Sequence, residues 1–120
     1  MASVTEDDIQ AAIAGHRVRN VELGRVLAST GVELAEKRPV DVHFWADDQR
    51  DAALLARELF RIGFLVKLPC PSEDRKDGRW NIEAGALVPP DQVLGDHLTE
   101  QLVRMAANGG AVYDGWGTQV

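Results

Sequence analysis

Cysteine and long apolar runs are both scarce in this sequence. Cys70 is the only cysteine in 120 residues, which excludes a disulfide within the chain and any zinc site built from several cysteines. No stretch approaches the roughly 20 apolar residues that span a bilayer. The N-terminus, Met-Ala-Ser-Val-Thr-Glu-Asp-Asp, lacks the basic and apolar segments of a signal peptide. We therefore expect a reduced, cytoplasmic protein without a membrane segment.

Basic side chains are outnumbered, with 13 Lys and Arg against 19 Asp and Glu and a formal net charge of −6. An acidic surface repels phosphate backbones, so direct nucleic-acid binding is disfavoured. A basic protein surface is a more natural partner for such a domain. The three histidines and the cysteine show no metal-ligand spacing, so we expect neither a metal nor another cofactor.

A first helix is predicted after Thr5, because Asp8 three residues later completes a capping-box pattern. Its inner stripe follows spacings of three and four and includes two polar residues: Ile9, Ile13, His16, Asn20, Leu23 and Leu27. Gly15 and Gly24 each cost about 1 kcal/mol relative to Ala inside a helix. We therefore expect a broken or loosely docked helix, and we treat residues 1–37 as an N-terminal helical extension.

Residues 38–120 alternate between strand and helix patterns, and we expect them to form one compact unit. Period-two alternation predicts strands at 40–45, 64–68, 80–86 and 111–116. Helical spacing predicts helices at 47–62, opened by Asp47, and at 91–108, opened by Asp91 or Asp96; residues 71–78 are expected to be a loop. The order βαββαβ matches the ferredoxin-like plait, an α+β fold. We expect a four-stranded antiparallel sheet in the order 4-1-3-2, with both of these helices on one face.

The sheet face opposite to those two helices is the first candidate site. Alternation along two neighbouring strands puts five side chains on it: Asp41, His43, Trp45, Asn81 and Glu83. An aromatic ring, an imidazole and two carboxylates make a plausible surface for recognition of a partner. Alternatively, the first helix covers this face, and its polar residues His16 and Asn20 contact these groups. The sequence leaves both alternatives open.

His43 near a carboxylate has the chemistry of a general base, but the sequence supplies no activated nucleophile beside it. We therefore expect no catalytic residues and no enzyme. A competing hypothesis is a small-ligand-binding or sensor plait that uses the open sheet face around His43 and Trp45.

The end of the chain, Gly110-Ala-Val-Tyr113-Asp114-Gly115-Trp116-Gly117, gathers aromatic residues and glycines where polar filler is usual. Gly115 fits a β-bulge, while Asp114 either contacts a partner or shapes the turn locally. Three further features accompany this stretch: Val42-His43-Phe44-Trp45, the run Ala56-x-x-Leu59-x-x-x-Gly63-Phe64, and Trp80. Together they resemble the regulator of ribonuclease activity B (RraB) family over about residues 20–120.

The resemblance implies a small bacterial cytoplasmic protein with a ferredoxin-like plait that inhibits an endoribonuclease through protein–protein contact and so modulates RNA degradation. One member of the family continues into a strongly acidic tail, whereas this sequence ends at Val120. Combining the open face with the terminal motif, we expect these partner-binding residues: Asp41, His43, Trp45, Glu83, Asp114 and Trp116. Homo-oligomer formation is left open.

Overall fold

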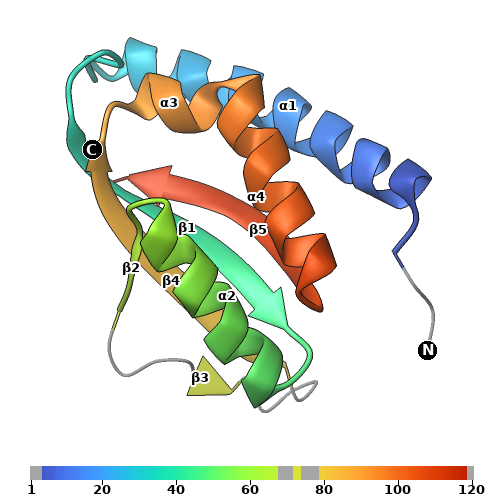
Figure 1. The fold of residues 1–120 in the computed structure, drawn as a ribbon. Helices are drawn as coiled ribbons and strands as arrows, with labels where there is room; N and C mark the ends of the chain where they lie inside the picture. The colour runs from blue at the N-terminus through green and yellow to red at the C-terminus, as the bar shows by residue number, and fades with distance from the viewer. Residues whose placement is uncertain (1–3, 68–71, 74–78, 119–120) are drawn as a thin grey trace.

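One antiparallel sheet and four helices make up the chain, in a computed structural model that describes residues 4–67, 72–73 and 79–118. The elements are α1 (Glu6–Ser29), β1 (Arg38–Ala46), α2 (Gln49–Arg61), β2 (Leu65–Val66), β3 (Ser72–Glu73), β4 (Trp80–Val88), α3 (Pro90–Leu94), α4 (Asp96–Asn108) and β5 (Ala111–Thr118). Figure 1 shows α2 and α4 lying across the same face of the sheet. The α+β class is therefore confirmed.

The four main strands lie in the order β2-β4-β1-β5, and every pairing between them is antiparallel. Counted from the β5 edge, this is the expected order 4-1-3-2. β1 is the central strand and pairs with β4 along its whole length, from Arg38 opposite Val88 to Ala46 opposite Trp80. The long β1–β4 ladder therefore fixes which side chains stand beside one another on the open face.

Two short elements differ from the prediction. The segment 71–78 was expected to be a loop, but Ser72–Glu73 forms strand β3 and pairs with Trp80 and Asn81 of β4; residues 71 and 74–78 lie outside the described part of the chain. A two-residue strand has too few positions to show alternation. The helix predicted at 91–108 is split into α3 and α4, because Gly95 has extended backbone between them.

The predicted helix starts also need correction. Asp48, not Asp47, caps α2 and accepts from the backbone N–H of Asp51 at 2.8 Å. Neither Asp91 nor Asp96 caps α4, because Gly95 is at the cap position and has no side chain to bond the first turn. Thr5 and Asp8 do form the expected capping box at α1, with both hydrogen bonds at 3.1 Å.

α1 is one continuous helix of 24 residues, so the predicted break at its glycines is wrong. The helix packs on α4 and α3, next to the edge strand β5 (Figure 1). Arg104 of α4 binds Glu6, and Asp96 of α4 binds Arg17 at 3.1 Å, which ties the helix to α4 at both points. Gly24 contributes to this packing, since a Cβ there would lie 3.3 Å from the side chain of Leu94.

The hydrophobic core lies between the helices and one face of the sheet. Alternate residues of β1 are fully buried there: Val40, Val42, Phe44 and Ala46. They pack with Ile82 of β4, Leu59 of α2 and Leu102 of α4, all of which are fully buried too. Each large apolar side chain buried in this way contributes about 1.5–3 kcal/mol. None of the helices in the described part of the chain is both long and apolar enough to cross a membrane.

Candidate functional site

The open face of the sheet carries the residues between the buried ones of β1. Asp41 lies between Gly85 of β4 and Gly117 of β5, and His43 lies between Glu83 and Gly115. At the far end, Trp45 lies between Asn81 and Val112. The five predicted side chains of this face are therefore brought together. α1 packs mainly on α4 and α3 and borders this face only at its β5 end, where Arg19 and Leu23 lie near His43.

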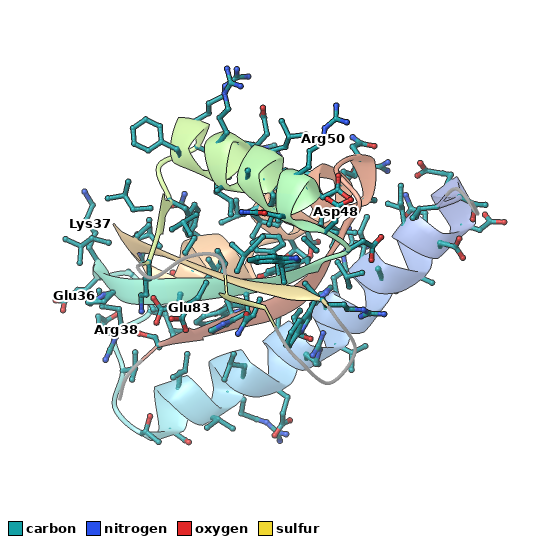
Figure 2. The ribbon with its side chains drawn as sticks, turned by 90° about the horizontal axis from the view of Figure 1, so that it is seen from below. Glu36, Lys37, Arg38, Asp48, Arg50 and Glu83 are labelled. Atoms are coloured by element: carbon teal, nitrogen blue, oxygen red, sulfur yellow. The ribbon has the colours of Figure 1, made fainter. Side chains whose placement is uncertain are left out.

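A charged cluster occupies the middle of the open face. Lys67 Nζ lies 2.8 Å from Asp41 Oδ1 and 3.5 Å from Glu83 Oε2, and so bridges two neighbouring strands. His43 Nδ1 lies 3.5 Å from the other oxygen of Glu83. The hydrogen bond to Asp41 raises the pKa of Lys67. Figure 2 shows the Glu83 side chain on the side of the sheet away from α2.

Lys67 was missed by the sequence analysis, although a signal for it exists. The strand predicted at 64–68 has Phe64, Val66 and Leu68 on its inner face, so Leu65 and Lys67 point outward; Leu68 lies outside the described residues. Lys67 directly follows the two-residue strand β2, and its backbone N–H donates to the Glu83 carbonyl at 2.9 Å. That bond extends the pairing by one residue and places the ammonium group beside the carboxylates.

Apolar side chains lie on both sides of this charged cluster. Leu65 and Leu87 are 61% and 63% exposed at one end of the open face, and Trp45 with Val112 forms the other end. Gly85 lies between these ends and leaves room for the Asp41 carboxylate, because a Cβ there would lie 3.1 Å from Asp41 Oδ1. A charged centre between exposed apolar groups is an arrangement suited to binding another protein surface.

The terminal motif lies on β5 and contains the expected bulge. The β1–β5 register shifts at Asp114, and Gly115 has a φ of +123°, a conformation that favours glycine. Asp114 is exposed there. Trp116, in contrast, is only 9% exposed and turns toward the helices, where its indole N–H donates to Asn20 Oδ1 at 3.0 Å. A direct contact between Trp116 and a partner is therefore restricted by burial.

Asn20 sits at the centre of a buried hydrogen-bond chain. It accepts from Trp116 and donates its amide N–H to Thr99 Oγ1 at 3.0 Å, and that hydroxyl in turn donates to the Val93 carbonyl at 3.4 Å. Every buried side-chain nitrogen and oxygen in the described residues has a hydrogen-bond partner. The polar interruption of the α1 stripe is thus a structural link between α1, α4 and β5.

His16 makes the second polar link, to the edge strand. Its Nε2–H donates to the Tyr113 carbonyl at 2.9 Å, and its Nδ1 accepts from the Arg19 guanidinium at 3.1 Å. A carbonyl only accepts and a guanidinium only donates, so the ring is neutral with its proton on Nε2. Burial, followed by the charge of Arg19, lowers the pKa of His16. Of the two alternatives left open, the one in which His16 and Asn20 bond the polar groups of the open face is not seen, because both residues bond to other groups.

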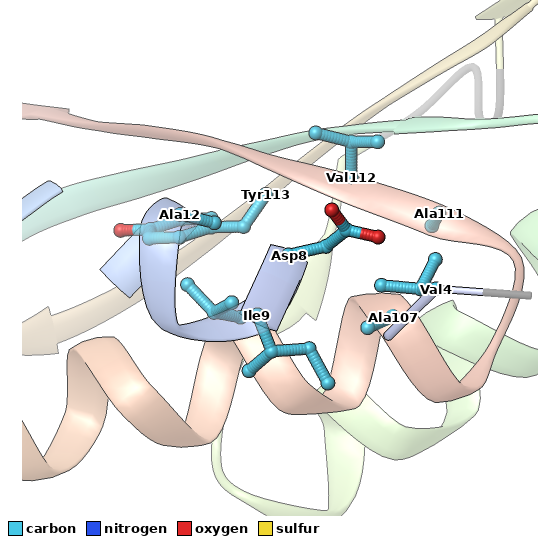
Figure 3. Close-up of a pocket in the computed structure, with 9 residues that line it drawn as sticks. Val4, Asp8, Ile9, Ala12, Ala107, Ala111, Val112 and Tyr113 are labelled. Atoms are coloured by element: carbon cyan, nitrogen blue, oxygen red, sulfur yellow. The ribbon is translucent and has the colours of Figure 1, made fainter. Parts of the chain in front are cut away.

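Tyr113 packs its ring against His16 and Phe44, at centroid distances of 4.5 Å and 5.1 Å. Burial raises the pKa of its hydroxyl. An apolar hollow of about 200 Å³ opens beside this ring, between the start of α1, the end of α4 and the start of β5 (Figure 3). Its lining includes Val4, Ile9, Val103, Ala107 and Ala111.

A second hollow, of about 270 Å³, lies where α1 meets the β5 end of the open face. His43, Asp114 and Arg19 contribute its polar groups, and Leu23 and Trp116 contribute apolar surface. In the parts of the chain that the structure describes, no cluster of three or more His, Cys, Asp and Glu could hold a metal ion.

Comparison with known proteins finds a match to one protein family. Residues 19–118 match the sequence model of the family described as regulator of ribonuclease activity B (RraB). The match covers every strand, three whole helices and the second part of α1. A search among curated proteins found no match.

Proposed function

The chain belongs to the regulator of ribonuclease activity B family, and on that premise we propose that it is a non-enzymatic regulator that binds an endoribonuclease. Binding would lower the activity of the ribonuclease by protein–protein contact in the cytoplasm. The docking surface is the open face of the sheet, and its centre is the cluster of Asp41, Glu83 and Lys67.

One observation supports this choice of surface above the others. Two carboxylates on neighbouring strands, Asp41 and Glu83, share the ammonium group of Lys67 on the sheet face opposite α2 and α4, and all three side chains are partly exposed. These side chains stay partly exposed, so solvent screens their attraction and the pairs contribute little to stability. The arrangement is therefore better suited to recognition than to holding the fold together.

The charges fit a basic partner. A guanidinium group from the partner can replace or join the Lys67 ammonium, because it donates to two carboxylate oxygens at once. The net charge of −6 adds long-range attraction, which mainly raises the association rate. Exposed Leu65 and Leu87 and the half-buried Trp45 then supply apolar contact area around the polar centre.

The six predicted partner-binding residues divide into two groups under this proposal. Asp41, His43, Trp45, Glu83 and Asp114 lie on the open face or at its rim and contact the partner directly. Trp116 acts indirectly, because its buried ring and its bond to Asn20 hold the β5 bulge beside that face.

A small-ligand-binding or sensor function is the second candidate. The observation in its favour is the 270 Å³ hollow beside His43, with Arg19 and Asp114 at its polar side. This volume is just under the range of about 300–1,000 Å³ that is usual for ligand pockets. The broad, exposed open face favours protein binding instead.

The test is an affinity measurement between the chain and a purified endoribonuclease, combined with an assay of RNA cleavage. Asp41→Asn/Glu83→Gln removes two charges from the open face and keeps the shape of both side chains. Glu58→Gln/Asp91→Asn is the control, since it makes the same change in net charge at exposed residues of α2 and α3.

We expect the open-face variant to bind at least about 10-fold more weakly and to lose inhibition, whereas the control retains both; 10-fold corresponds to about 1.4 kcal/mol. Equal affinity for the two variants would show that the open face is not the docking surface. If the wild-type chain binds no endoribonuclease but a small ligand protects it from thermal unfolding, the second candidate function replaces the first.

A further inference from the structure

A hollow of about 470 Å³ lies on the open face beside the charged cluster, and it is larger than the hollows beside Tyr113 and His43. Its volume falls within the range of about 300–1,000 Å³ that is usual for ligand pockets. Residues of β1, β2 and β4, with the residue that follows β2, line it; they include Pro39, Asp41, Leu65, Lys67, Gly85 and Leu87. A space of this size on the proposed docking surface can receive a whole side chain of a partner.

The strand pairing explains why the hollow exists. Gly85 of β4 lies directly opposite Asp41 of β1 on one side and opposite Leu65 of β2 on the other. Pro39 and Leu87 form the next pair of β1 and β4 that points to the same face. Because Gly85 has no side chain, the space among these four residues stays open. We call this space the Gly85 hollow.

The Gly85 hollow has an apolar side and a charged side. Leu65 and Leu87 supply the apolar side, and both are exposed. Asp41 and Lys67 supply the charged side, and Glu83 lies 3.5 Å from the same ammonium group. Two carboxylates and one ammonium group leave one negative charge in this cluster. An occupant that fits both sides has a long apolar stem and a positively charged end.

Lys67 shows this mode of binding within the chain itself. A Cβ on Gly85 would lie 3.5 Å from Lys67 Cε and 3.1 Å from Asp41 Oδ1, so the lysine stem passes beside Gly85 before its ammonium group reaches the carboxylate. An ionised carboxylate offers about four acceptor sites, so one ammonium group cannot saturate both Asp41 and Glu83. A second cationic group can therefore join Lys67 at this cluster.

A guanidinium group suits the remaining acceptor sites better than a second ammonium group. It is planar, spreads its charge over three nitrogens and can donate two parallel hydrogen bonds to one carboxylate. It is also more weakly hydrated than an ammonium group, so it loses less on entering a partly apolar hollow. A second compact ammonium group would instead concentrate like charge beside that of Lys67.

We propose, on the premise of the proposed function, that the Gly85 hollow receives one arginine side chain of the partner protein. The guanidinium group binds Asp41 beside the Lys67 ammonium, and the methylene stem packs against Leu65 and Leu87. Gly85 is then a specificity-determining residue, because a side chain at this position fills the hollow.

One methyl group added on either side of Asp41 tests the proposal. Gly85→Ala places a Cβ in the hollow, whereas the control Gly117→Ala places it on the other side of Asp41, where it meets nothing within 4 Å. Neither glycine has a positive φ, and both variants keep the net charge. Gly85→Ala should weaken binding to a purified endoribonuclease about 10-fold, through faster dissociation at an unchanged association rate. Gly117→Ala should bind as the wild type does, and circular dichroism confirms that both variants are folded.

A small probe tests the chemistry of the hollow without any ribonuclease. The ¹⁵N-labelled chain is titrated with N-acetyl-arginine N-methylamide up to ~50 mM, because a single side chain should bind only in the millimolar range. This compound should shift the backbone signals of Gly85, Leu87 and Lys67 and bind several-fold more tightly than its lysine analogue. The citrulline analogue has nearly the same shape without the charge and should shift none of them. Gly85→Ala should abolish the shifts, and Gly117→Ala should retain them.

The two experiments distinguish this proposal from the proposed function. If the open face binds an endoribonuclease but Gly85→Ala and Gly117→Ala have equal affinity, the arginine assignment is wrong and the docking surface stands. If the arginine compound binds as expected but the chain binds no endoribonuclease, the proposed function is wrong and the hollow remains a site for arginine. Equal binding of the lysine compound, or the same shifts with the citrulline compound, would show that the hollow does not recognise a guanidinium group.

Discussion

Replacing Asn20 with Ala should destabilise the fold more than any other polar substitution on α1. The change removes hydrogen bonds to Trp116 and Thr99, both at 3.0 Å. Thr99 keeps its bond to the Val93 carbonyl, but the indole N–H is left buried without a partner. An orphaned buried donor costs about 1–3 kcal/mol, and each lost bond about 0.5–1.5 kcal/mol.

The orphaned Trp116 donor and the lost bond to Thr99 together lower the free energy of unfolding by about 1.5–4.5 kcal/mol. For a domain of this size, each kcal/mol lowers Tm by about 3–6 °C. Urea unfolding followed by circular dichroism gives the free energy, and Gln10→Ala is the matched control. Gln10 is also an amide on α1, but it is exposed and bonds to the exposed Glu6, so its loss should stay within about 0.5 kcal/mol.

A double-mutant cycle with Trp116→Phe separates the hydrogen bond from the packing. Coupling between Asn20 and Trp116 should be about 0.5–3 kcal/mol, as for residues in direct contact. If Asn20→Ala costs no more than Gln10→Ala, or if the coupling is zero, the buried chain does not link α1 to β5. The position of α1 would then need another explanation.

Three further predictions concern the pH dependence, the bulge and the charged cluster. Folding lowers the pKa of His16, so the unfolded chain binds a proton more readily than the folded chain. The stabilisation from neutral His16 is therefore fully present above its ordinary pKa of about 6.5 and is lost as the pH falls through the lowered value. His16→Gln should remove that part of the slope in urea titrations at several pH values. Gly115→Ala should cost about 1–3 kcal/mol from its positive φ, whereas Gly117→Ala, with open space around it, should stay within about 0.5 kcal/mol in the same unfolding assay; equal costs would contradict the bulge argument. Lys67→Met should change stability by less than about 0.5 kcal/mol yet raise the association rate with a basic partner in stopped-flow measurements, and a slower association would contradict the assigned polarity of the face.

The four main strands and the open-face residues could be predicted because their pattern is local. Alternation along β1 places Val42 and Phe44 on one face and His43 on the other, whatever the neighbouring elements are. The inner stripe of α1 was also predicted, including its two polar residues. The surface against which this stripe packs could not be predicted, because its partners Tyr113 and Trp116 are more than 90 residues away in sequence.

The bulge in β5 changes the face of the sheet on which Trp116 lies. Strict alternation from Tyr113 would place Trp116 on the opposite face of β5, with the open-face residues. The bulge at Asp114 inserts one extra residue, so both aromatic rings turn toward the core. Gly115 indicated a bulge in the sequence, but its exact register depends on pairing with β1, which only the assembled sheet defines.

The central claim is that the open face binds an endoribonuclease, and an NMR titration tests it most directly. The ¹⁵N-labelled chain is titrated with a purified endoribonuclease, and the backbone signals that shift or broaden are mapped. We predict that they centre on Asp41, His43, Glu83 and Lys67 and spare α2. Changes centred on α2 or on the exposed Val18 and Val21 of α1, or no changes at saturating ribonuclease, would contradict the account.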